Sequence, residues 1–223
     1  IPAIGTIARA LARMPSAGLP RRTLVIAGLL VGLASGAKLT AATFAVGLCV
    51  AILLRGPFDR QALARHFGEA FVFGLGVLAG VAITLGPWAW ALWTHFDSPI
   101  FPYGNQWIKS PWWGDYEVLT RQYVPHNLND WLLFPFRLVA PAPFFVAEVP
   151  YRDARMATAY FLALLAAAAW WSHRFSGRHA PVVHPGVSAA WRLVSGFFLT
   201  SFLLWTAQHS IYRYALVLDA LTG

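Results

Sequence analysis

One stretch of the chain decides the fold class: Ala70–Trp93, which reads AFVFGLGVLAGVAITLGPWAWALW. None of its residues is charged, and at about 1.5 Å per residue it is long enough to cross the roughly 30 Å hydrocarbon core of a bilayer. Gly74, Gly76 and Gly80 have a spacing at which small residues let two helices approach closely. Tryptophans gather at the far end, as they do at the headgroup level of membrane helices. The stretch therefore predicts a membrane-crossing helix, with a kink near Pro87.

The composition of the whole chain indicates the same class of protein. Apolar residues make up 58% of the 223 residues and charged residues 12%, and the mean hydropathy is +0.55, which leaves too little polar surface for a soluble domain. The net charge is +8, but the basic residues lie between apolar runs and form no stripe, so we expect membrane lipid and no nucleic acid as a partner. The single cysteine, Cys49, excludes an internal disulfide and a cysteine-based metal site.

The apolar runs predict an all-α fold: one polytopic transmembrane helix bundle with a large, partly irregular outer loop. Helices are expected at about residues 23–37, 39–54, 67–93, 156–172, 189–207 and 211–223, and the outer loop at 95–155. Small residues before Lys38 are expected to break the first apolar run into a hairpin.

Basic residues orient these helices. Arg21 and Arg22 precede the hairpin, and Arg55, Arg60 and Arg65 follow it, so the positive-inside rule places both of its ends in the cytoplasm and sends the next helix outward. The chain opens without the apolar core of a signal peptide, and its last apolar run stops after about three turns. We therefore expect both ends to be cut from a longer protein.

Two cations could hold an anionic substrate. Lys38 lies within an apolar stretch, where an ammonium costs several kcal/mol unless it reaches water, a partner or a phosphate. Arg213, beside Tyr214, begins a helix on the outer face, where a guanidinium can hold a phosphate bidentately. Both could instead snorkel to the headgroups, as long basic side chains do in any membrane helix. We expect Lys38 and Arg213 to face one outward-opening cavity.

The outer loop adds a third candidate. Its residues 98–111 combine prolines, aromatic rings, amide donors and the cation Lys109, which suits a sugar or lipid headgroup, although a well-packed loop would look similar. Asp97, Asp115 and Glu117 could be solvated loop acids or ligands of a divalent cation. No spacing rule singles them out, so we assign no metal site and no cofactor and leave a divalent cation open.

Three segments resemble the GT-C superfamily of polytopic bacterial membrane glycosyltransferases, which use polyprenyl-phosphate sugar donors. The segments are Gly28–Thr40, with its central Gly-x-Lys-x-Thr, the Pro-Ile-Phe-Pro-Tyr loop from Pro99 to Pro111, and Tyr212-Arg213-Tyr214. The resemblance implies transfer of a sugar, with inversion, from a lipid-linked donor to an envelope glycan, lipid or protein acceptor at the outer face of the bacterial inner membrane.

The same resemblance assigns roles to residues. Lys38 and Arg213 are expected to face the lipid phosphates, and the outer loop to help cover the cavity. The residues expected to bind substrate are Lys38, Lys109, Arg213 and Tyr214. The family's catalytic acid lies in its first outer loop, which would precede Ile1, so the catalytic residue is unknown here.

Other functions fit part of the pattern. An oligosaccharide polymerase or ligase also uses outer-face arginines and polyprenyl-linked glycans. A transporter or flippase uses paired half-helices in repeated halves, and the broken hairpin at Lys38 fits one such pair, although no second copy is apparent. A non-catalytic membrane protein is the remaining alternative.

Overall fold

The computed structural model describes residues 4–7, 18–116, 118, 123–139, 152–175, 185–211, 214–215, 217–218 and 221. Within these residues the chain forms helices and turns and no strand, so the predicted all-α class is confirmed for this part of the protein. Contacts divide the chain into two units, one of Ile1–Thr120 with Pro185–Ser201 and one of Arg121–His184 with Phe202–Gly223.

The first unit contains most of the long helices. They are α2 (Arg21–Ala37), the short 3-10 helix η1 (Leu39–Ala41), α3 (Ala42–Leu54), α4 (Arg60–Phe96) and the larger part of α9 (Pro185–Gln208). The chain breaks at Lys38, whose extended backbone (φ −149°, ψ 105°) separates α2 from η1. This is where the sequence places the hairpin turn.

Helix α4 is longer than the expected 67–93. It begins at Arg60 because the side chain of Asp59 accepts a hydrogen bond from the backbone N–H of Ala62 (2.9 Å), which satisfies a donor of the first turn. It ends where Asp97 adopts a left-handed conformation (φ 54°). Pro87 lies inside the helix and does not end it.

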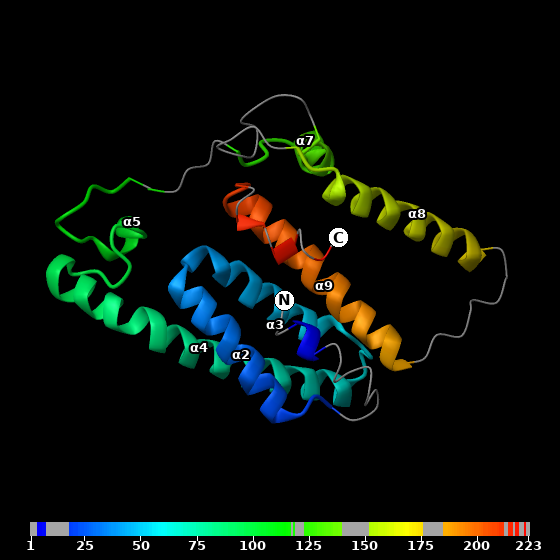
Figure 1. Ribbon diagram of the computed structural model, residues 1–223, viewed down its shortest axis with the longest axis horizontal. Helices are drawn as coiled ribbons and strands as arrows, with labels where there is room; N and C mark the ends of the chain where they lie inside the picture. Colours follow the sequence, from blue (N-terminus) through cyan, green and yellow to red (C-terminus); the bar gives the residue numbers. More distant parts are fainter. Residues whose placement is uncertain are drawn as a thin grey trace. The chain divides into compact units, whose positions relative to one another are not determined.

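Glycines set the contact between α2 and α4, which lie side by side (Figure 1). A Cβ atom on Gly76 would lie 2.7 Å from the carbonyl oxygen of Val25, and one on Gly80 would lie 2.5 Å from that of Leu29. Further along the pair, the Thr84 hydroxyl donates to the Leu33 carbonyl (3.2 Å). Contacts advance along both helices together, so α2 and α4 run parallel, as the predicted topology requires.

Helices α3 and α9 run antiparallel within the same unit. The Phe44 and Phe197 rings meet at 6.3 Å between centroids, and at the other end of α3 the Arg192 Nε donates to the Arg55 carbonyl (2.5 Å). This pairing and the parallel contact between α2 and α4 bring the arginines of four segments to one end of the unit, which we call the arginine end. They are Arg21, Arg22, Arg55, Arg60, Arg65 and Arg192.

Two helices of the described residues are long and apolar enough to cross a membrane: α4, and α9 over Ala189–Gln208. In the most apolar window of each, only 22% and 33% of the residues are buried, whereas a core helix of a soluble protein is mostly buried. Two further apolar helical segments are shorter: Leu39–Leu54, which covers η1 and α3, and Arg155–Leu165 of α8 (Arg155–Phe175). The polytopic bundle expected from the sequence stays a prediction.

The second unit holds α6 (Leu128–Leu132), α7 (Phe134–Arg137), α8 and the end of α9. Phe134 is fully buried against the rings of Phe202 and Trp205, and the Trp205 indole donates to the Ile211 carbonyl (3.0 Å). Of the expected helix 211–223, only residues 211, 214, 215, 217, 218 and 221 are described.

The cap on α4 predicts an acid-dependent loss of stability. The hydrogen bond from Ala62 N–H lowers the pKa of Asp59, so its carboxylate stabilises the folded state above the unfolded pKa, and this contribution is lost as the pH falls through the lower folded pKa. We expect Asp59→Ala to lower the melting temperature at pH 7. Asp59→Asn, which also caps a helix, should retain most of it and flatten the acid limb of the melting-temperature profile. A profile identical in wild type and Asp59→Asn would contradict this assignment.

Candidate functional site

An ordered loop, residues 97–116, follows the end of α4 opposite the arginine end. Helix α5 (Asn105–Ile108) lies within it, between Gly104 and Lys109, which both have positive φ values (65° and 59°). Each of these two residues turns the backbone sharply at one end of α5. The loop therefore has a defined path despite having a single helical turn.

Asn105 holds this loop together. It is 2% exposed, its Nδ2 donates to the carbonyls of Ser110 (3.1 Å) and Trp113 (2.6 Å), and its Oδ1 accepts from the Ser110 N–H (2.8 Å). The Ser110 hydroxyl in turn donates to the Phe96 carbonyl (2.5 Å) at the end of α4. The buried amide, with its donors and acceptor satisfied, fixes the loop internally, and Ser110 joins the loop to the helix.

Aromatic rings form the body of the loop. Phe96 and Phe101 stack at 4.2 Å between centroids with an interplanar angle of 6°, and Trp112 and Trp113 contact them edge-on. Other rings remain exposed, Trp107 at 79%. The exposed rings, called the aromatic platform below, are Tyr103, Trp107, Trp112 and Tyr116. Such rings can stack on the apolar face of a sugar or lie at a lipid headgroup level.

Lys109 follows α5, two residues after Trp107. Its ammonium forms an ion pair with Asp115 (2.6 Å), and both side chains are exposed, at 59% and 66%. An exposed pair of this kind contributes little to stability because water screens it. It leaves a cation and a carboxylate available beside the exposed rings.

Lys38 lies in the half of the first unit nearer the loop, close to the level of Thr84 on α4. It is exposed, and the neighbouring Gly36 packs against Thr84 of α4. Thr84 and Phe96 are 12 residues apart on α4, which corresponds to about 18 Å along the helix axis. The structure therefore does not bring Lys38 and Lys109 together.

The other two predicted substrate-binding residues, Arg213 and Tyr214, belong to the second unit. Arg213 lies outside the described residues, so a cavity shared by Lys38 and Arg213 stays a prediction. Tyr214 is half-buried, and its ring meets that of His209 edge-on at 5.6 Å. Burial lowers the pKa of His209, which favours the neutral form of this imidazole.

Two of the three acids considered as metal ligands lie within the described residues. Asp97 is exposed after α4, Asp115 is paired with Lys109, and Glu117 lies outside the described residues. No group of three or more histidine, cysteine, aspartate or glutamate side chains gathers in the part of the chain that the structure describes.

A buried ion pair at the arginine end was missed by sequence reasoning. Arg55 donates to the carboxylate of Glu69, whose other oxygen accepts from the Leu19 N–H (3.0 Å). The side chains are only 4% and 9% exposed. Burial lowers the pKa of Arg55, opposed by the charge of Glu69. The available sequence signal was that Glu69 is the one acid between Asp59 and Asp97.

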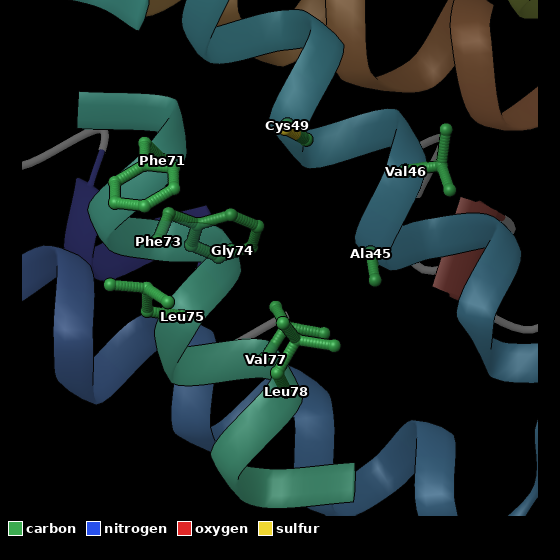
Figure 2. Close-up of a pocket in the computed structure, with 9 residues that line it drawn as sticks. All are labelled: Ala45, Val46, Cys49, Phe71, Phe73, Gly74, Leu75, Val77 and Leu78. Atoms are coloured by element: carbon green, nitrogen blue, oxygen red, sulfur yellow. The ribbon is translucent and has the colours of Figure 1, made fainter. Parts of the chain in front are cut away.

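Sequence reasoning also missed an apolar groove between α3 and α4. It has a volume of about 310 Å³ and is lined by side chains of both helices (Figure 2). The lining residues are Ala45, Val46 and Cys49 of α3, and Phe71, Phe73, Gly74, Leu75, Val77 and Leu78 of α4. None is charged, so the groove suits hydrocarbon rather than a polar substrate.

No family model matches the chain, and no curated protein or solved structure is significantly similar to it. The features of the first unit that bear on function are the aromatic platform with Lys109 after α4, Lys38 at the break after α2, and the arginines at the opposite end.

Proposed function

We propose that the chain is part of a polytopic integral membrane protein of the bacterial inner membrane, with its arginine end in the cytoplasm. Three features of the first unit support this. Six arginines lie at one end, large apolar side chains such as Phe71, Leu78 and Ile83 are exposed along α4, and Trp88, Trp90 and Trp93 are exposed near its other end. Charge at one end, apolar surface between and tryptophan at the other is the arrangement that a bilayer favours.

We further propose that the protein is a GT-C-like glycosyltransferase that transfers a sugar from a polyprenyl-phosphate donor to an envelope glycan, lipid or protein acceptor. The observation that carries this proposal is the aromatic platform, in a loop that Asn105 holds together and that the Ser110 hydroxyl joins to the end of α4. Exposed rings can stack on a sugar, and the cations Lys109 and Lys38 can attract phosphate. The resemblance at Gly28–Thr40 and Pro99–Pro111 supports the same assignment.

Donor binding tests this function directly. The full-length protein in nanodiscs is titrated with a polyprenyl-phosphate sugar, and wild type is compared with Lys38→Ala, Lys109→Ala and Arg213→Ala. We expect Lys38→Ala and Arg213→Ala each to weaken binding about tenfold, or about 1.4 kcal/mol. A loss is also expected for Lys109→Ala, whose ammonium has to leave its ion pair with Asp115 to hold the donor phosphate.

Arg22→Ala is the matched control, since it removes an exposed cation from the arginine end. It should leave donor affinity unchanged. An affinity that is insensitive to Lys38 and Arg213, or an equal loss in the control, would contradict the proposed phosphate contacts. Absence of any donor binding would contradict the transferase assignment itself and favour a transporter or a non-catalytic membrane protein.

A further inference from the structure

The groove between α3 and α4 opens outward rather than closing into a core. Phe71, Leu75 and Leu78 on α4 and Val46 on α3 line it and are also exposed. At Gly74, an added Cβ would meet no atom within 4 Å, so the groove has room there for an apolar ligand. Figure 2 shows the wall residues of both helices around this space.

Arg60 lies on the same face of α4 as the groove, closer to the arginine end. Arg60, Phe67, Phe71, Gly74 and Leu78 are separated by seven, four, three and four residues, and this spacing places them along one side of a helix. Arg60 and Phe67 are both exposed. This face of α4 therefore carries a guanidinium at the arginine end, followed along the helix by Phe67 and the apolar groove.

The lengths along this face match one leaflet of a bilayer. From Phe67, where the apolar part of the face begins, to Leu78, at the upper end of the groove, α4 rises about 16 Å. Half of the hydrocarbon core is roughly 15 Å thick. Arg60 lies a further 10 Å or so toward the arginine end, where an arginine reaches the phosphates of that leaflet.

We propose that this face binds one anionic glycerophospholipid of the cytoplasmic leaflet, with its phosphate on Arg60 and one acyl chain in the α3–α4 groove. Charge complementarity and the apolar lining select an amphiphile with a negative headgroup. The inference rests on the proposed membrane embedding but not on sugar transfer, because the site lies at the end of the unit opposite the aromatic platform.

Photo-crosslinking tests this site. The full-length protein is reconstituted in nanodiscs with phosphatidylglycerol or phosphatidylcholine carrying the same photoactivatable acyl chain, and crosslinked peptides are identified by mass spectrometry. We expect crosslinks in residues 45–49 and 71–78. They should be about fivefold stronger with the anionic lipid, as one arginine near a membrane surface contributes about 1 kcal/mol.

Two variants test the acyl-chain contact and the headgroup contact separately. Gly74→Leu fills the groove and should remove its crosslinks with both lipids, whereas Gly68→Leu, also in open space but on another side of α4, should not. Arg60→Gln should abolish the preference for the anionic lipid. Arg65→Gln is its control, since the Arg65 side chain lies beside Gly18, on a different side of the helix.

The two proposals fail in different ways. Crosslinks at Ile83 and other exposed apolar residues of α4, without any in the groove, would overturn the lipid site and leave membrane embedding intact. Groove crosslinks that persist in Gly74→Leu would also overturn the site, and so would equal labelling by the two lipids. An absence of crosslinks along the whole of α4 would overturn both.

Discussion

Gly80→Leu is expected to prevent α2 from packing on α4. A Cβ atom at Gly80 would lie 2.5 Å from the carbonyl oxygen of Leu29 and 2.6 Å from the amide nitrogen of Leu33. Both are backbone atoms, so no side chain can rotate away, and the helices have to separate. We expect a loss of at least about 3 kcal/mol in the free energy of unfolding, the upper range for overpacking, measured as a lower melting temperature and a smaller monodisperse peak in size-exclusion chromatography.

Gly68→Leu on the same helix is the matched control. A Cβ atom at Gly68 would meet no atom within 4 Å, so this leucine should fit without moving a neighbour. Both variants add the same apolar volume and remove a glycine from α4. Equal melting temperatures for the two would show that the glycine contact does not hold α2 against α4.

Glu69→Gln should destabilise the arginine end of the first unit by about 3–5 kcal/mol, the cost of leaving one member of a buried ion pair alone. The Arg55 guanidinium would stay buried without its counter-charge, although glutamine can still accept the hydrogen bond from Leu19. Thermal unfolding followed by intrinsic tryptophan fluorescence measures the loss.

Two further variants control for this interpretation. Asp115→Asn breaks the exposed pair with Lys109 and should change stability little, because water screens that pair. Replacing both Arg55 and Glu69 with methionine removes the unpaired charge and should recover part of the loss. A Glu69→Gln protein as stable as wild type would mean that water reaches Arg55.

The sequence was sufficient to predict the helical class and the break at Lys38, because long uncharged runs and a Ser-Gly-Ala-Lys interruption are local signals. It was not sufficient for the start of α4. Hydropathy begins the helix near residue 67, since residues 60–66 include two arginines and a histidine, but the Asp59 cap starts it at Arg60. A cap depends on one side-chain bond and is not visible in an apolar average.

The candidate site shows a similar division. Prolines, rings and Lys109 led us to predict a functional loop at residues 98–111, which stays a prediction. The role of Asn105 depends on carbonyls five to nine residues away that only the folded loop brings together. The pair of Arg55 and Glu69 joins two helices across a turn, and the groove exists only between α3 and α4. Features made by two segments carry no local sequence signal.

The parallel contact between α2 and α4 also constrains the order of assembly during synthesis. Because α3 separates α2 from α4 in the sequence, the glycine face of α2 is synthesised well before the helix on which it packs. Gly76 and Gly80 follow the end of α2 by about 40 residues, which a ribosome adds in roughly 2–8 seconds. During that interval the glycine face of α2 has no α4 to pack on. The surroundings of the nascent helix therefore have to keep this face from packing on another helix.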